Sequence, residues 1–253
     1  MTKDEFLDLR AEGFTFKEIG GFFNLSERQV NYRTKAWGLD FSKKKVLDHT
    51  FFSRNTKETY YWAGFLAADG WVEEERNRVG LALQASDISH LEKFKSAVSS
   101  SHEICPFMQN TAYRIRFNSE DMVKDLRNRF NIVKSKTYNY QMPIFEEDYL
   151  MLEFLRGYIE GDGHLERTAS GRVAVHLCSA SESFLLEYKR IVESILYCNV
   201  PQEIYYATNK KGSVYTLRLN LDISRDLINL LYKNSSEATR LNRKYDVAKL
   251  VLR

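Results

Sequence analysis

The chain has 253 residues, 43% of them hydrophobic, which is enough to bury a sizeable core in one or two domains. Its formal net charge is only +3, so a nucleic acid would bind only if the basic residues were gathered on one surface. The three cysteines are widely spaced, which excludes a disulfide framework and the paired spacing of a zinc site.

The sequence also predicts a soluble, intracellular protein that is not secreted. Residues 1–5 lack an apolar signal core, and no window approaches the roughly 20 apolar residues that a membrane span requires. The unpaired cysteines fit a reducing compartment. We therefore expect no membrane partner.

Residues 1–40 have the pattern of a small helix-turn-helix domain. Apolar residues recur through a first helical stretch that ends near Gly13. Thr15 and Glu18 have the spacing of a capping box that opens a second helix, and a tight turn follows at 24–25. A third helix completes the predicted domain.

The third helix is the candidate DNA-reading element. Ser26 can cap a helix over 27–37 that buries Val30 together with Ala36 or Trp37. Its other side chains are of the types that contact base edges or phosphates in the major groove. These candidate DNA-binding residues are Arg28, Gln29, Asn31, Tyr32, Arg33 and Lys35. A helical interaction module is the alternative interpretation.

One nonapeptide pattern occurs twice, as Trp62-Ala-Gly-Phe-Leu-Ala-Ala-Asp-Gly70 and as Leu155-Arg-Gly-Tyr-Ile-Glu-Gly-Asp-Gly163. Each copy places a Gly inside an apolar helical run, which destabilises a helix unless two backbones approach closely there. Each also ends in Asp, although a carboxylate at a helix C-terminus opposes the helix dipole. The pattern predicts two helices that pack along small-residue faces and bring two carboxylates together.

The sequence after each copy follows the same course. A strand-like stretch, a helical stretch, a second strand and a further helix come in that order. The corresponding ranges are 78–84 and 172–178, 91–98 and 185–192, and 113–118 and 215–220. An internal repeat of this kind is stronger evidence than a single motif match.

These repeated motifs resemble the LAGLIDADG homing endonucleases, in the monomeric form that carries both motifs in one chain. The resemblance implies an α+β fold in which two pseudosymmetric αββαββα repeats form saddle-shaped DNA-binding sheets. It divides the chain into the helix-turn-helix domain 1–40, a basic linker 41–56, a first repeat 57–146 and a second repeat 147–253. The linker begins with a run of lysines that suits phosphates or simply solvent.

The paired carboxylates of Asp69 and Asp162 are the candidate catalytic and metal-binding groups. A lone Asp-Gly would normally be a turn, but its duplication inside matching motifs favours two sites, one for each DNA strand. Phosphodiester hydrolysis uses a metal ion, and hard oxygen ligands select Mg²⁺, with Mn²⁺ as the substitute. By resemblance, the carbonyl groups of Ala68 and Gly161 complete the ligands.

A basic group near each scissile phosphate would stabilise the negative charge of the transition state. In the first repeat a late segment resembles the family's lysine-bearing segment, and we favour Lys136 over Lys134 there. In the second repeat the sequence leaves Arg243 and Lys244 open, and Lys244 is the candidate carried forward. Glu160 is interpreted as secondary, because its counterpart in the first motif is not acidic.

Sequence recognition is expected from the strands, because alternate side chains line one face of a sheet. A slip of one residue in register would reverse the choice of face, so the candidates form a pool. The pool comprises Arg76, Arg78, Gln84, Arg114, Arg116, Arg167, Arg172, His176, Tyr205, Lys210, Lys211 and Arg218.

The resemblance implies a site-specific homing endonuclease that makes a metal-dependent staggered double-strand cut in DNA with 3′ overhangs. Its partner would be a double-stranded DNA target, and its gene would lie in an intron or intergenic element of a phage, organelle or microbial genome. The alternatives are an RNA maturase that binds intron RNA and a DNA-binding transcription regulator. A nicking enzyme also stays open, because the two halves have diverged.

Overall fold

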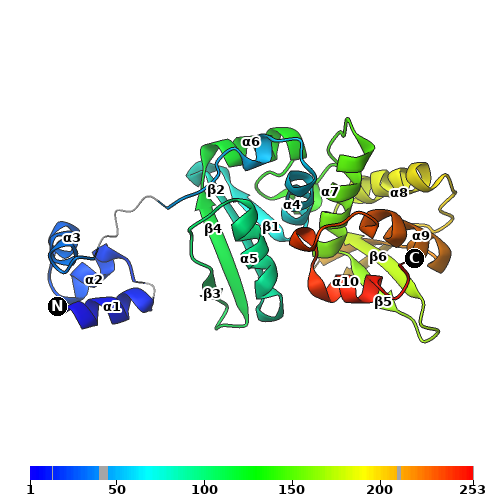
Figure 1. Ribbon diagram of the computed structural model, residues 1–253. Helices are drawn as coiled ribbons and strands as arrows, with labels where there is room; N and C mark the ends of the chain where they lie inside the picture. Colours follow the sequence, from blue (N-terminus) through cyan, green and yellow to red (C-terminus); the bar gives the residue numbers. More distant parts are fainter. Residues whose placement is uncertain (13, 40–44, 210–211, 253) are drawn as a thin grey trace. The chain divides into compact units, whose positions relative to one another are not determined.

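The computed structural model describes residues 1–12, 14–39, 45–209 and 212–252. The chain divides into two compact units, Met1–Lys45 and Val46–Arg253, whose elements are shown in Figure 1. Gly13, the lysines at 43 and 44, and the DNA-binding candidates Lys210 and Lys211 lie outside the described residues. No described helix combines the length and the apolar character that crossing a membrane demands.

The N-terminal unit is built from three short helices, α1 (Lys3–Ala11), α2 (Phe16–Phe22) and α3 (Glu27–Ala36). Each begins with a complete capping box, and the pairs are Thr2 with Glu5, Thr15 with Glu18 and Ser26 with Gln29. Phe6, Ile19 and Val30, one from each helix, are fully buried at the centre. Thr34 joins them, whereas Ala36 is exposed and Trp37 is half-buried.

The larger unit contains one order of elements twice. The first set comprises α4 (Lys57–Asp69), β1 (Gly70–Glu73), β2 (Arg78–Gln84), α5 (Ile88–Ala97), β3 (Cys105–Phe107), β4 (Ala112–Asn118) and α6 (Glu120–Phe130). The second comprises α7 (Asp148–Gly161), β5 (His164–Arg167), β6 (Val173–Ser179), α8 (Glu182–Leu196), β7 (Tyr205–Asn209), β8 (Gly212–Arg218) and α9 (Leu221–Tyr232), followed by α10 (Asn242–Ala248). The predicted mixed αβ fold with two αββαββα repeats is confirmed.

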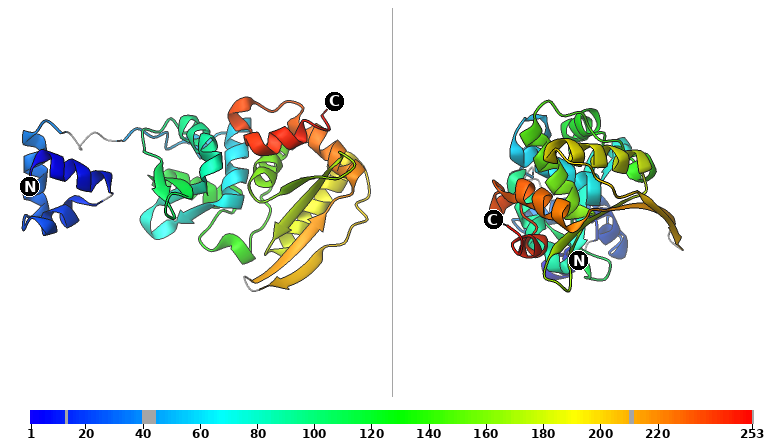
Figure 2. Two further views of the ribbon diagram at one scale, coloured as in Figure 1. Left: turned by 90° about the horizontal axis from the view of Figure 1, so that it is seen from below. Right: turned by 90° about the vertical axis from the view of Figure 1, so that its right-hand side faces the viewer.

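Each set forms its own four-stranded antiparallel sheet, ordered β1-β2-β4-β3 and β5-β6-β8-β7. The registers correspond, because Gly80 pairs with Arg116 in the first sheet and His176 pairs with Arg218 in the second. Helices pack on one face of each sheet, as Figure 2 shows for α8 and α9 on the second. The alternating burial of β2 and β4 leaves the other face to polar side chains.

Part of the predicted linker belongs to the larger unit. Phe51 and Phe52, in the short 3-10 helix η1 (Phe51–Ser53), are buried in the core. The Thr59 hydroxyl donates to the Phe51 carbonyl at 3.0 Å, and Arg129 of α6 donates to the Phe52 carbonyl. The segment packs because burial of two aromatic rings removes a large apolar area from water. The free energy gained in this way is larger than the tendency of the preceding basic residues to stay in solvent.

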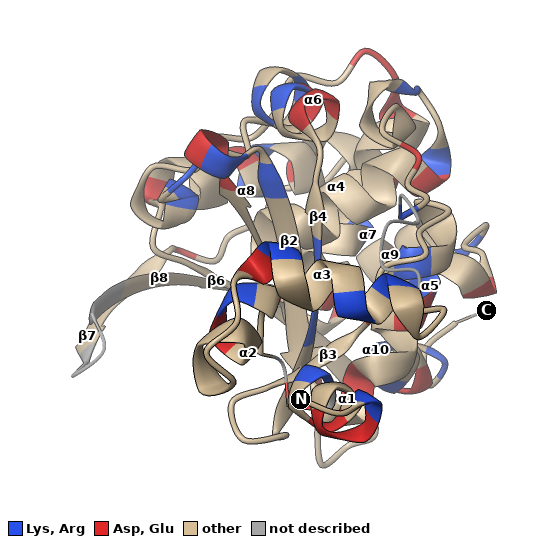
Figure 3. Ribbon diagram, turned by 90° about the vertical axis from the view of Figure 1, so that its left-hand side faces the viewer, with Lys and Arg blue, Asp and Glu red and all other residues tan. Residues whose placement is uncertain are grey.

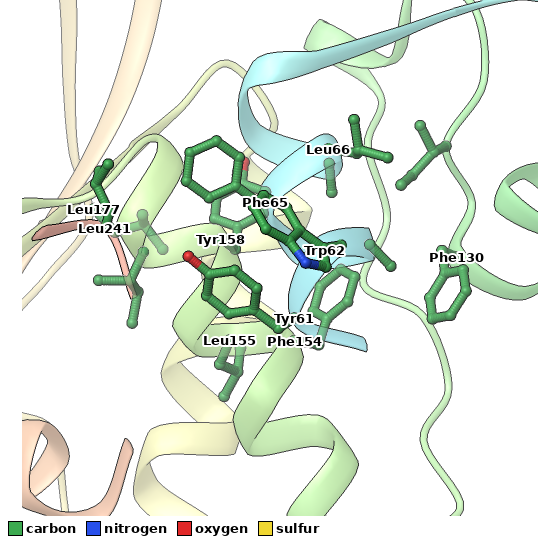
Figure 4. Packing of buried hydrophobic residues seen from close by; sticks show 14 of the residues in the cluster. Tyr61, Trp62, Phe65, Leu66, Phe130, Phe154, Leu155, Tyr158, Leu177 and Leu241 are labelled. Carbon is green, nitrogen blue, oxygen red and sulfur yellow. The ribbon is translucent and has the colours of Figure 1, made fainter. Parts of the chain in front are cut away.

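Helices α4 and α7 cross at the centre of the larger unit, between the two sheets (Figure 1). A Cβ on Gly64 would lie 2.0 Å from the Phe154 carbonyl oxygen, and one on Gly157 would lie 2.0 Å from that of Tyr61. A side chain at either position would collide with backbone, so the predicted packing along the glycine faces is confirmed. Figure 4 shows the aromatic and aliphatic side chains that surround this crossing.

Candidate active site and nucleic-acid interface

The crossing brings the C-terminal ends of α4 and α7 together. Asp69 is the last residue of α4, and Asp162 is the C-cap of α7. A Cβ built on Gly161 would lie 2.4 Å from Ala68 Cβ and 3.6 Å from Asp69 Oδ2. The carboxylate of the first motif therefore lies against the end of the second motif helix, as the sequence pattern predicts.

The environment of the two carboxylates opposes their ionisation. Burial raises the pKa of Asp162 to about 6, and the charge of Asp69 adds to this rise. Burial also raises the pKa of Asp69, while Lys244, Arg243 and Lys136 lower it. Both residues keep exposed surface, so only part of each carboxylate loses its solvent. A bound cation would reduce the electrostatic repulsion between the two carboxylates.

A lysine ammonium lies at each Asp-Gly end. Lys136, in the 3-10 helix η4 (Lys136–Tyr138), donates to the Gly70 carbonyl at 2.7 Å. Lys244 of α10 donates to the Gly163 carbonyl at 2.6 Å. Gly70 and Gly163 occupy the same place in the two motifs, so the two lysines hold equivalent positions. Burial lowers the pKa of both ammonium groups, that of Lys244 to about 8.

The neighbours of these lysines are engaged elsewhere. Lys134 forms an exposed ion pair with Glu75 at 2.6 Å. Arg243 Nε donates to Asp87 Oδ2 at 2.8 Å, which links the second repeat to the first. The charge of Arg243 also lowers the pKa of Asp69, so this guanidinium contributes to the field of the site. Geometry therefore favours Lys136 and Lys244 as the lysines at the helix ends, and their catalytic roles stay predictions.

The two lysines are held to different degrees. Lys244 is only 5% exposed and donates to the carbonyls of Ile159, Gly161 and Gly163 at 2.9, 2.8 and 2.6 Å. An ammonium has three donors, so the C-terminal end of α7 engages all of them. Lys136 is less deeply buried. The Gly161 carbonyl, a predicted metal ligand, thus already accepts one hydrogen bond and has one lone pair left.

The donor set at the helix ends fits a hard divalent cation. Asp69 and Asp162 offer carboxylate oxygens, and Ala68 and Gly161 offer carbonyl oxygens, which is the ligand chemistry that Mg²⁺ and Mn²⁺ accept. Over 1–12, 14–39, 45–209 and 212–252, no group of three or more His, Cys, Asp or Glu residues is arranged to hold a metal. A metal bound here would complete its shell with carbonyl oxygens, water or phosphate oxygens.

The register places most of the first-sheet candidates on the open face. The residues on the face opposite buried Val79 are Arg78, Gln84, Arg114 and Arg116. Arg78 pairs with Glu73 at 3.3 Å, and Arg114 lies 4.6 Å from the centre of the Phe107 ring. Arg76, in the 3-10 helix η2 (Glu74–Arg76), is exposed beside the sheet and also pairs with Glu73.

The second sheet divides its candidates between two faces. His176 and Arg218 lie on the open face, and both contact the Glu166 carboxylate, at 3.2 and 3.0 Å. Arg172 instead pairs at 2.6 Å with Asp222 of α9, a helix on the covered face. Arg167 pairs with buried Val173 and so lies on the same face of the sheet as that residue. Exposed Tyr205 lies on the open face.

All six candidates on α3 are exposed, and Figure 3 shows its Lys and Arg positions in blue. The Gln29 side chain accepts the Ser26 amide within the capping box, at 2.8 Å. Asn31 donates to the Glu27 carbonyl, and Arg33 donates to the Met1 carbonyl. Tyr32 is 77% exposed, a large value for an aromatic side chain in a small domain. DNA binding by α3 stays a prediction.

Helix α7 also carries a buried charged cluster that the motif comparison does not predict. Arg156 and Glu160 are 1% and 0% exposed, although both stand within the second nonapeptide. Glu153, Arg156 and Glu160 are spaced so that they share one helical face, and this spacing was a signal available in the sequence. Glu160 is buried away from solvent, and its interpretation as secondary stays a prediction.

Residues 150–239 match the family described as the LAGLIDADG-like domain. The structure of I-DmoI in complex with DNA and Ca aligns with a TM-score of 0.51 at 14% identity, covering 80% of this chain and 98% of that one. The I-LtrWI LAGLIDADG homing endonuclease bound to target DNA aligns with a TM-score of 0.49 at 12% identity, covering 77% and 89%. No curated protein matches the chain. The chain is thus similar to the LAGLIDADG-like domain over residues 150–239, and it has the fold of the LAGLIDADG homing endonucleases.

Proposed function

We propose that this protein is a site-specific DNA endonuclease of the homing type, which cuts both strands of a double-stranded target. The observation that carries the proposal is the crossing of α4 and α7, which pairs Asp69 with Asp162 and gives each helix end its own lysine. Cutting two strands requires two sets of groups, and the pseudosymmetry supplies them. A binding protein on this fold would need neither carboxylate.

The chemistry divides among the residues at the helix ends. Asp69 and Asp162, with the carbonyls of Ala68 and Gly161, would hold Mg²⁺ or Mn²⁺. Such an ion, when bound, supplies an activated water and stabilises the leaving oxygen. The I-DmoI complex with DNA and Ca supports a divalent ion on this fold. Lys136 and Lys244 place positive charge where negative charge develops on the phosphate.

The open sheet faces and α3 would contact the target. Arg78, Arg114 and Arg116 on one sheet, with His176 and Arg218 on the other, offer donors to guanine edges and phosphates. On binding, the basic residues paired with Glu73 and Glu166 would exchange these carboxylates for DNA oxygens. This exchange favours specific DNA binding over non-specific binding. We further propose that the protein acts as a monomer and leaves staggered ends with 3′ overhangs.

The test is cleavage of a randomised duplex DNA library with Mg²⁺, followed by sequencing of the ends. The wild-type protein should yield one family of staggered cuts. Asp69→Asn and Asp162→Asn should each lose about 100-fold or more in double-strand cutting, because each removes the charge of one carboxylate. Asp222→Asn, which removes a surface carboxylate that pairs with Arg172, is the control. This variant should cut the target as the wild type does.

Other outcomes would redirect the assignment. Retention of one sequence without cutting, by wild type and variants alike, would contradict the endonuclease and support a transcription regulator. Failure to cut or retain any duplex, with binding to structured intron RNA, would instead support a maturase. A single nick in the wild type would mean that the two halves are no longer equivalent.

A further inference from the structure

The second motif helix carries a cluster of charges that is closed off from solvent. Arg156 pairs with Glu153, and with Glu160 Oε1 at 3.7 Å. The same guanidinium donates to the carbonyl of Thr239 and, at 2.9 Å, to its hydroxyl. Charges buried to this degree are expensive unless they are fully matched, and apolar residues of similar size often replace them without loss. Their presence on α7 therefore calls for a role beyond packing.

Glu160 extends this cluster to the start of α10. Its Oε2 accepts the Tyr61 hydroxyl at 2.5 Å and the Leu241 amide at 2.7 Å. Leu241 is the N-cap of α10 and supplies no side-chain cap of its own. A carboxylate at this point satisfies an amide and complements the positive end of the helix. Lys244 follows within the first turn of α10.

The first motif has no equivalent of this connection. The positions that correspond to Arg156 and Glu160 are Ala63 and Ala67, both buried in the core. The segment that carries Lys136 is joined to β1 through the Gly70 carbonyl and, at Lys134, to Glu75. The segment that carries the second lysine is therefore bonded to a charged residue of its motif helix, whereas the first motif has alanines at these positions.

We propose that Glu160, braced by Arg156, is a positioning residue for Lys244. It fixes the N-terminus of α10 and so holds the Lys244 ammonium at the end of α7, beside Asp162. This inference rests on the proposed endonuclease function, and it predicts that the two DNA strands differ in their dependence on Glu160. Glu160 itself is 0% exposed and does not reach the substrate.

The test compares single-turnover cutting of each strand of a selected target, with the two strands labelled separately. Glu160→Gln keeps the shape and removes the charge. We expect it to slow one strand by about tenfold, leave the other within about twofold, and accumulate nicked DNA. Lys244→Met should slow the same strand. Because Glu160 acts through Lys244, the double variant should be no slower than Lys244→Met alone.

A matched control separates positioning from general destabilisation. Glu153→Gln removes a charge from the same cluster but has no bond to Leu241, so both strands should be cut nearly as in the wild type. Equal slowing of both strands by Glu160→Gln, or additive losses in the double variant, would overturn the proposal. A binding titration accompanies each variant, since a positioning role predicts unchanged DNA affinity.

Hydrogen exchange provides a readout that does not require cutting. In Glu160→Gln the backbone amides of 241–248 should exchange faster than in the wild type. The exchange rates of those α4 amides that do not contact α7 should be unchanged. If the wild type cuts no DNA, the endonuclease proposal fails. Unchanged hydrogen exchange of the 241–248 amides in Glu160→Gln would refute the positioning role, whether or not the protein cuts DNA.

Should Glu160→Gln fail to fold, Leu241→Pro and Leu241→Ala form a second pair. Both shorten the buried side chain, but only proline removes the N–H that Glu160 accepts, and Leu241 has a φ of −76° that proline can adopt. A strand-selective loss larger in Leu241→Pro than in Leu241→Ala is expected. Equal effects of the two substitutions would count against Glu160.

Discussion

Asp69 and Asp162 are placed where their charges disfavour the folded protein. Each stands at the C-terminal end of a helix, where the dipole opposes a carboxylate. Burial raises the pKa of both, and the charge of Asp69 adds to the rise at Asp162. Lys136 and Lys244 offset part of this repulsion, since both lower the pKa of Asp162. Residues held against stability in this way are typical of functional sites.

The pH dependence of stability should reveal this repulsion. The pKa of Asp162 is about 6 in the folded protein and 3.8 ordinarily. Between these values the folded state binds more protons than the unfolded state, so this group makes stability fall as pH rises through the window. Asp162→Asn should therefore be more stable than wild type near neutral pH, by about 1 kcal/mol once solvent exposure is discounted. Urea unfolding with and without Mg²⁺ measures the difference.

The difference should vanish below about pH 4, where Asp162 is protonated in both states. Mg²⁺ should reduce this difference in stability, because a cation between the carboxylates stabilises only the wild-type pair. Asp222→Asn, which removes an exposed carboxylate, serves as the control and should gain no stability at neutral pH. An Asp162→Asn variant less stable than wild type at neutral pH would show that the two carboxylates do not repel.

At the scale of elements, the crossing of α4 and α7 depends on backbone contact. Gly157→Ala would place its Cβ 2.0 Å from the Tyr61 carbonyl oxygen and 2.9 Å from the Phe65 amide nitrogen. Backbone cannot yield as a side chain does, so we expect a loss of about 3 kcal/mol in the free energy of unfolding. Gly21→Ala, in α2, has nothing within 4 Å and should be neutral or slightly stabilising. Denaturant unfolding decides, and an unchanged midpoint for Gly157→Ala would contradict the close approach.

Elements with a local signal could be predicted from the sequence. The glycines in apolar runs predicted the helix crossing, and alternating residues predicted β2 over Arg78–Gln84. Contacts between distant segments could not be predicted in the same way. Nothing local distinguishes Lys244 from Arg243 until α10 packs against the end of α7. Likewise Arg172, which lies just before β6, pairs with Asp222 of α9, a contact between segments 50 residues apart.

At the scale of the whole molecule, the two units have separate cores. Phe6, Ile19 and Val30 form the centre of the N-terminal unit, while the paired carboxylates and both lysines belong to Val46–Arg253. The larger unit therefore contains the complete candidate active site. The N-terminal unit adds an exposed helix, α3, with side chains suited to DNA. Because the cores are separate, truncation can test whether the proposed cutting and the proposed DNA contact of α3 belong to different units.

A fragment of residues 46–253 should fold and cut the selected target, but with weaker and less salt-sensitive binding. Loss of the cations Arg28, Arg33 and Lys35 should lower affinity by about tenfold or more and reduce the slope of log affinity against log salt. Nuclease protection should cover a shorter stretch of DNA. The full chain with Arg28→Ala and Lys35→Ala is the matched variant, because it keeps the N-terminal core and should reproduce part of the loss. If the fragment binds as tightly and protects the same length, α3 does not contact DNA and the unit serves another partner.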